Sequence, residues 1–243
     1  MICLGTIVNV VSILTGGIIG LLLKKLLSRR ITDTITQGVG LSVVIVGVSG
    51  ALSAAYTVIE KKLNSDHLLL MIISLAIGGL IGELLSIEDN LDKFARGLEK
   101  RFSRSGEASD LAQGFITATL VFCVGSMAII GSIEDGINRN SDILIAKSAL
   151  DGITSMVFAS TMGVGVLFSA ITVGAYQGSI TLLAMYIAPY FNELVITQIS
   201  LIGSVLIMSI GFNMLNITKI KVGNLLPAVF IPILRYVILS LLN

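Results

Sequence analysis

The sequence has few charged residues and few prolines. Only 13% of its 243 residues are charged, about half the share found in soluble domains, so a globule of this size could not cover itself with polar groups in water. Proline occurs three times and the frequent glycines follow no triplet period, which excludes a collagen-like or a disordered chain. The 16 Lys and Arg residues nearly balance the 15 Asp and Glu residues, so no nucleic-acid partner is expected.

The residues of the common catalytic centres are scarce as well. The one histidine, His67, leaves no His-rich zinc motif such as HExxH, and neither GxSxG nor a phosphate-binding loop occurs. Cys3 and Cys123 stand in apolar stretches, which is typical of packing thiols. Asp151 is the only carboxylate expected deep in a membrane, so an aspartyl dyad has no second member. We expect no enzymatic activity, no cofactor and no metal centre.

Long apolar runs are what the sequence does have. The chain is 54% apolar with a mean hydropathy of +0.96, and about 20 apolar residues in a helix cross the hydrocarbon core of a bilayer. The runs lack the period-2 alternation of strands. We expect an all-α polytopic transmembrane bundle, with about eight spans at residues 3–23, 38–59, 68–86, 112–133, 143–168, 169–189, 195–216 and 222–242.

Two stretches stand out against this pattern. Residues 143–178 carry several glycines in apolar surroundings, which makes a broken or re-entrant helix a candidate there and leaves seven or nine spans as alternatives. Residues 87–111 form the only long polar insert, expected to be a cytoplasmic loop with a solvated, mixed-charge surface. We otherwise expect residues 1–243 to form a single integral membrane domain.

The distribution of basic residues predicts the orientation. Eleven Lys and Arg residues fall in the loops after the first, third and seventh spans, against three on the opposite side. Short cytoplasmic loops retain positive charge, so both termini are expected outside the cytoplasm. Positive charge follows the first apolar stretch and does not precede it, so this stretch should remain as a membrane anchor.

An internal repeat is visible in two of the spans. VSILTGGIIGLLL (11–23) and ISLAIGGLIGELL (73–85) agree at seven of thirteen positions, and each is followed by a charged loop and Gln-Gly. We therefore predict repeat units at about 1–59 and 68–133. Small residues at every fourth position let helices approach closely in lipid, which predicts that the repeated glycines serve helix packing: Gly16, Gly20, Gly78 and Gly82.

Asp151 is the main functional candidate, because an ionisable group at bilayer depth is costly and needs a partner or a purpose. Lys147 lies one helical turn earlier, so a closed intrahelical ion pair is one interpretation. The other is a polar path on which Asp151 binds a proton, a metal cation or an ammonium group. Further candidates for substrate or ion binding, each with helix packing as the alternative, are Ser148, Ser155, Asn9, Gln177 and Asn213.

Six strings along the chain resemble one bacterial membrane family. They are GTIVNVVSILTGGIIG (5–20), IGGLIGELL (77–85), GSIEDG (131–136), AKSALDGITSMVFASTMGVGVLFSA (146–170), YQGSITLL (176–183) and VGNLLPA (222–228). In this order they resemble the YdfK/YqgA-like family, known as domain of unknown function 554. The resemblance implies a bacterial inner-membrane protein and a candidate transporter, and it brings no substrate and no assigned site residues.

Two functions follow from these observations. The first is a transporter or channel for a small solute or ion, acting as a homo-oligomer in the bacterial cytoplasmic membrane. The second is a membrane scaffold or regulatory protein that transports nothing. A cavity reaching Asp151 would support transport, whereas a closed contact of Asp151 with Lys147 or Arg235 would favour the scaffold. The glycines interspersed with polar residues between 147 and 178 favour transport.

Overall fold

The described part of the computed structural model confirms the all-α polytopic bundle. It comprises residues 2–26, 29–59, 62–64, 66–90, 93, 108–123, 126–188 and 191–242. Seven helices in these ranges are long and apolar enough to cross a membrane, and a bent pair of helices makes an eighth span if the two count as one. The strands found in these ranges form one short antiparallel hairpin, β1 (Thr57–Ile59) with β2 (Lys62–Asn64), in which Val58 pairs with Leu63 in the backbone register.

The chain divides into two compact units. The first comprises Met1–Val39 and Asn90–Ile187, and the second comprises Gly40–Asp89 and Ala188–Asn243. The helix α2 begins in the first unit and ends in the second. The other helices of the first unit are α1 (Leu4–Leu26), α5 (Ala108–Cys123), α6 (Ser126–Ile137), α7 (Asp142–Met162) and α8 (Gly165–Ile187).

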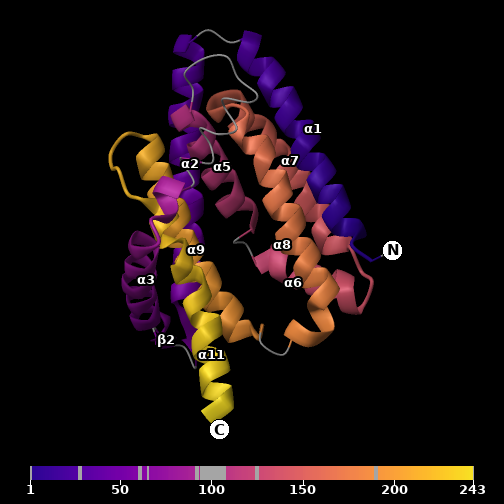
Figure 1. Ribbon diagram of the computed structural model, residues 1–243, viewed down its shortest axis with the longest axis vertical. Coiled ribbons are helices and arrows are strands. Elements are labelled where there is room, and N and C mark those ends of the chain that lie inside the picture. The colour runs from indigo at the N-terminus through magenta and orange to yellow at the C-terminus, as the bar shows by residue number, and fades with distance from the viewer. Residues whose placement is uncertain are drawn as a thin grey trace. The chain divides into compact units, whose positions relative to one another are not determined.

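In the first unit, α1 and α7 pack side by side in parallel (Figure 1). A Cβ atom added to Gly16 would lie 2.0 Å from the carbonyl oxygen of Gly152, and one added to Gly20 would lie 2.2 Å from that of Met156. The two backbones therefore touch without intervening side chains. Small residues permit this approach, and in lipid such packing replaces the hydrophobic drive between helices.

The bent pair α5–α6 lies along α8 in the same unit. The two helices are inclined by 58°. A Cβ atom on Gly165, at the start of α8, would lie 2.0 Å from the carbonyl oxygen of Leu111 in α5. Farther along α8, the carbonyl oxygen of Thr181 would lie 2.3 Å from a Cβ atom on Gly136 in α6. Because α5 and α6 accompany α8 from near its start to near its end, the pair follows the path of one interrupted span.

The structure corrects the expectation of a broken helix at residues 143–178. This region contains two complete helices, α7 and α8, which meet at Gly163. Gly163 ends α7 with a φ of +81°, a conformation that side-chain-bearing residues rarely adopt. Gly152, Gly165 and Gly174 lie in helices and mark close helix contacts, whereas Gly178 has open space beside it. The interrupted span is α5–α6 instead.

The second unit is organised around α9. Its fully buried side chains include Val195, Leu201 and Leu206, and the C-terminal half of α2 packs against it, since a Cβ atom on Gly47 would lie 2.5 Å from the backbone nitrogen of Met208. The elements of this unit are the end of α2 (Arg29–Ala55), α3 (Asp66–Leu84), α9 (Glu193–Met214), α10 (Val222–Leu225), the 3₁₀ helix η2 (Leu226–Phe230) and α11 (Ile231–Leu242).

A second glycine contact joins α3 to α10 and η2. A Cβ atom on Gly78 would lie 2.3 Å from the backbone nitrogen of Ala228, and one on Gly82 would lie 1.8 Å from the carbonyl oxygen of Asn224. The order of these contacts makes the segments antiparallel, whereas α1 and α7 are parallel. All four glycines predicted to serve packing thus lie at backbone contacts.

The second span differs in its boundaries from the range predicted from the sequence. The second span was expected at 38–59, but α2 begins at Arg29 and ends at Ala55, and β1 follows. A helix satisfies its own backbone hydrogen bonds in water as well as in lipid, so it extends past the apolar run that reveals it. Most of the predicted cytoplasmic loop at 87–111 lies outside the described residues.

Candidate functional site

A buried polar stripe runs along α7. Lys147, Asp151 and Ser155 stand four residues apart, as do Leu144 and Ser148, which places them on one side of the helix. The face is buried at Leu144, Lys147, Ser148, Asp151 and Ser155. Asp151 is the tenth of 21 residues in α7, about 14 Å along the axis at 1.5 Å per residue. The carboxylate therefore sits near the middle of a helix long enough to cross the membrane.

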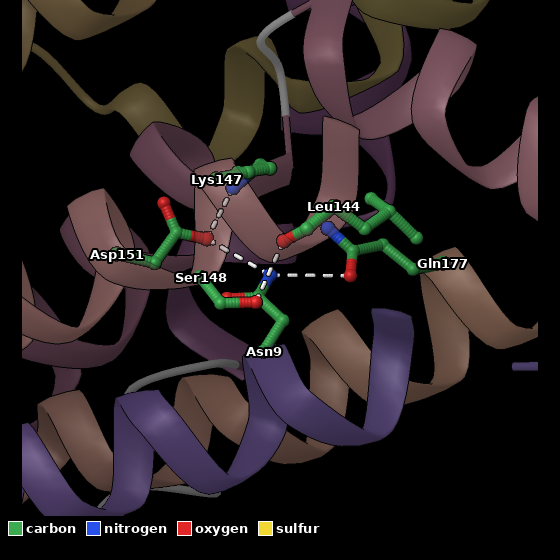
Figure 2. Close-up of polar contacts among 6 residues, drawn as sticks. All are labelled: Asn9, Leu144, Lys147, Ser148, Asp151 and Gln177. Atoms are coloured by element: carbon green, nitrogen blue, oxygen red, sulfur yellow. Dashed lines mark hydrogen bonds and ion pairs between the residues drawn. The ribbon is translucent and has the colours of Figure 1, made fainter. Parts of the chain in front are cut away.

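Lys147 and Asp151 form a closed ion pair on this face. The Lys147 ammonium contacts Oδ2 of Asp151, and the two side chains are only 6% and 9% exposed (Figure 2). The spacing of four residues brings the two side chains together on the helix surface. The basic neighbour anticipated from the sequence is thus Lys147, and the carboxylate is in the closed arrangement that we associated with the scaffold.

Two further helices extend this pair into a chain of hydrogen bonds, each with one amide side chain. Asn9 of α1 donates from Nδ2 to Oδ2 of Asp151 at 3.0 Å and to Oε1 of Gln177 in α8 at 3.2 Å (Figure 2). Asn9 and Gln177 are fully buried. The structure therefore joins four of the seven predicted site residues, Asn9, Lys147, Asp151 and Gln177, into one group, which we call the Asp151 network.

The Asp151 network contains two unpartnered polar atoms. Oδ1 of Asn9 and Nε2 of Gln177 are buried and have no hydrogen-bond partner among the described residues. A buried donor or acceptor without a partner costs about 1–3 kcal/mol, and such groups are rare in native proteins. The network therefore retains one free acceptor and one free donor next to its charges.

An aromatic side chain covers the cationic end of the network. Nζ of Lys147 lies 5.8 Å from the ring centroid of Phe122 in α5, within the range in which a ring face attracts a cation. Phe122 in turn stacks on Phe158, with the centroids 6.3 Å apart. Phe122 was missed by the sequence analysis, because an apolar span gives no signal of which aromatic ring faces a lysine.

The three remaining candidates have local partners. Ser148 donates to the carbonyl oxygen of Leu144 in its own helix at 2.6 Å, and Ser155 donates across to Ile13 of α1 at 2.8 Å. Asn213 lies in the second unit, where its side chain bonds both backbone groups of Ile220 and the hydroxyl of Thr218. Ser148 and Ser155 thus border the Asp151 network, and Asn213 organises the turn after α9.

A second buried carboxylate corrects the view that Asp151 is the only deep one. Asp135 of α6 is fully buried, accepts from Ser141 at 2.8 Å through Oδ1, and leaves Oδ2 without a partner among the described residues. The expected fourth span ended at residue 133, which placed Asp135 in a loop. The burial of the GSIEDG segment within α6 was not visible in its hydropathy, because its polar residues end the apolar run.

Comparison with known proteins assigns the chain to a family. The model of the family described as Protein of unknown function (DUF554) matches residues 4–237. This chain belongs to that family. It is 37% identical over 228 residues to "Uncharacterized membrane protein YdfK" of Bacillus subtilis (strain 168), covering 94% of this chain and 93% of that protein. It is 26% identical over 231 residues to "Uncharacterized protein YqgA" of Escherichia coli (strain K12), covering 94% of each.

No solved structure matches the chain. Family membership confirms the resemblance seen in the sequence and agrees with a membrane protein containing several apolar helices. The names of these two relatives state no activity. The chemistry of this DUF554 chain therefore has to be argued from its own buried groups.

Proposed function

We propose that this membrane protein moves a small solute or ion across the bacterial cytoplasmic membrane, with the Asp151 network as the binding site for the cargo or its coupling ion. The observation that supports this is the meeting of an acid, a base and two amides from α1, α7 and α8 near mid-helix, with two polar atoms left unpartnered. Intramembrane ionisable residues commonly mark ion and substrate paths.

The energetics favour a functional role over a stabilising one. The desolvation of a buried ion pair largely cancels its attraction, so apolar residues of similar volume would hold the helices as well or better. The unpartnered atoms of Asn9 and Gln177 add a further cost. Close packing of α1 and α7 is already provided by Gly16 and Gly152. The network thus costs stability that helix packing alone does not require.

In the proposed mechanism, Lys147 occupies the cation position of an empty site. A proton, a metal cation or an ammonium group that reaches Asp151 would displace the Lys147 ammonium from Oδ2. The free Oδ1 of Asn9 would supply a second oxygen to a metal cation or to an ammonium group. The closed ion pair would then be the resting arrangement of an alternating-access or gated cycle.

A scaffold or regulatory protein is the second candidate, and a specific observation favours it. The Lys147–Asp151 pair is closed and nearly inaccessible, as expected if Asp151 only holds α7 against α1 through its hydrogen bond with Asn9. In that case neither group would exchange its partner, and the chain would stabilise or regulate another membrane protein.

We also propose an orientation in the membrane and an oligomeric state for the protein. We place both termini outside the cytoplasm on the basis of the positive-inside rule, and we propose a homo-oligomer without catalytic activity. Intact cells can be treated with a membrane-impermeant reagent that modifies amines. Modification of the protein's N-terminal amine would test whether the N-terminus lies outside the cytoplasm. Cross-linking in the native membrane would test the oligomer.

The transport proposal is tested by proton flux into liposomes that contain the purified protein and a pH-sensitive dye. A potassium diffusion potential drives protons inward, and metal cations and small amines are then added one at a time. We expect Asp151→Asn to lower the flux about tenfold or more, the effect of losing a contact worth about 1.4 kcal/mol. Asp142→Asn is the matched control, because Asp142 is exposed at the start of the same helix.

Two results would overturn the transport proposal. One is flux no greater than that of empty liposomes for protons, metal cations and amines alike, with folded protein in the membrane. The other is equal flux through Asp151→Asn and the unmodified chain. Either result would leave the scaffold as the better account of the Asp151 network.

A further inference from the structure

A cavity of about 480 Å³ lies in the second unit between the start of α9 and α11, which lines it from Pro232 to Ser240. It is separate from the Asp151 network, and the inference drawn from it does not rest on transport. Its polar lining consists of Asn192, Gln198, Arg235, Tyr236 and Ser240. The volume falls within the range of small-ligand sites.

Arg235 gives the cavity a positive charge. It belongs to a segment, Val222–Ser240, that is apolar and long enough to span a membrane, and no acidic side chain lies within ion-pair distance of it in the described parts of the chain. The acidic residue nearest in sequence to the cavity, Glu193, is exposed and is not part of the lining. An arginine inside a membrane span calls for a counter-charge, and its guanidinium suits phosphate oxygens.

The start of α9 adds donors to the same cavity. Oδ1 of Asn192 caps the helix by accepting from the backbone nitrogen of Val195 at 2.9 Å, which leaves the Asn192 NH₂ group available as a donor. The helix dipole also favours an anion at this end. Tyr236 and Ser240 add two hydroxyl groups. The cavity is therefore rich in donors and carries a net positive charge.

Gln198 supplies an acceptor. Gln198 lines the cavity and is only 4% exposed. Its Nε2 lies 3.4 Å from Nδ1 of His67. Oε1 is buried and has no partner among the described residues. A buried acceptor of this kind is satisfied by a hydroxyl or by water. A ligand that pairs with both the donors and this acceptor has an anionic group and a hydroxyl.

Apolar side chains complete the lining and indicate an amphipathic ligand. Leu194, Pro232 and Leu239 line the cavity together with the polar groups, and Leu194 and Leu239 are 48% and 46% exposed. We propose that this cavity binds an anionic phospholipid whose head group carries a hydroxyl. Its phosphate would lie on Arg235, its hydroxyl would donate to Oε1 of Gln198, and its acyl chains would follow Leu194 and Leu239.

The test measures lipid binding to delipidated full-length protein in detergent, by native mass spectrometry and by the thermal midpoint. Mixed micelles carry phosphatidylglycerol or, at the same mole fraction, phosphatidylcholine. We expect phosphatidylglycerol to bind preferentially and to raise the midpoint. Arg235→Gln should weaken its apparent affinity about tenfold or more, as expected for loss of a charge-assisted hydrogen bond. Lys219→Gln, which removes an exposed charge in the same unit, should bind it like the unmodified chain.

A parallel measurement with a soluble phosphate ester distinguishes a lipid ligand from a free phosphate ester. If glycerol 3-phosphate stabilises the protein as much as phosphatidylglycerol does, the ligand is a soluble phosphate and the lipid assignment fails. Equal binding of the two lipids by the unmodified chain would also overturn the proposal, and this comparison needs no variant to fold. An unchanged lipid preference in Arg235→Gln would do the same.

Discussion

Two glycine-lined helices, α1 and α3, carry the same Ser-x₃-Gly-x₃-Gly pattern and use it in different ways. In α1, Gly16 and Gly20 lie against the backbone of α7, which runs parallel to α1. In α3, Gly78 and Gly82 lie against α10 and η2, which run antiparallel to α3. The pattern therefore fixes how closely two backbones approach, and it does not fix the direction or the identity of the partner helix.

Each of these contacts also carries an acid, a lysine and an asparagine. Beside α3, Glu83 accepts from Lys221 at 3.0 Å and from Asn224 at 2.5 Å. The side chains of Lys221 and Glu83 are 57% and 62% exposed, against 6% and 9% for Lys147 and Asp151. Similar groups thus lie in water at one contact and in the protein interior at the other. The contrast shows that the burial of an ion pair, and not the chemical groups in it, decides how much free energy its desolvation costs.

The largest effect is expected when one partner of the buried pair is removed. Lys147→Met leaves the Asp151 carboxylate without its counter-charge, which should lower the free energy of unfolding by about 3–5 kcal/mol. Lys221→Met removes a lysine of comparable pairing at the exposed contact and should give no resolvable change. Unfolding in mixed micelles, followed by circular dichroism, measures both variants.

A double variant tests the cause of this loss. Lys147→Met combined with Asp151→Leu removes both charges, and much of the lost stability should return, because no unpaired charge stays buried. Equal destabilisation by Lys147→Met and Lys221→Met would break the contrast between the two contacts.

A smaller effect is expected from the glycines. Gly16→Ala places a Cβ atom 2.0 Å from the carbonyl oxygen of Gly152, so the backbones must separate, at a cost of about 1–3 kcal/mol. Gly178→Ala is the matched control in the same unit, since nothing lies within 4 Å of its added Cβ atom. Alanine favours a helix over glycine by up to about 1 kcal/mol, so the control should be neutral or slightly stabilised.

Gly82→Ala extends the glycine test to the second unit. Its Cβ atom would lie 1.8 Å from the carbonyl oxygen of Asn224, so we expect a loss similar to that of Gly16→Ala. Unfolding in mixed micelles, followed by circular dichroism, measures the glycine variants and the control as well. Losses of similar size in both helices would support a common packing role, whereas tolerance at Gly82 would confine that role to α1.

The sequence predicted the spans well because hydropathy reports which segments lie in lipid. It did not predict the interruption between α5 and α6, because no proline marks it and the Gly125-Ser126 pair at this point lies within a continuous apolar run. The pairing of Lys147 with Asp151 follows from a spacing of four residues along one helix. Asn9 and Gln177 could be named only as candidates, because their meeting depends on how three helices pack. The origin of α1 and α3 by duplication stays a prediction.

The most direct test of the central claim asks whether water reaches the Asp151 network from both sides of the membrane. Ser148→Cys, in a chain with Cys3→Ser and Cys123→Ala, is treated with a membrane-impermeant maleimide in right-side-out and inside-out vesicles. Ser169→Cys is the control, because Ser169 is also buried and bonds its own helix. We predict labelling at position 148 from both faces and none at 169. A folded Ser148→Cys protein that is not labelled from one of the two faces, or from both, would contradict transport through this network.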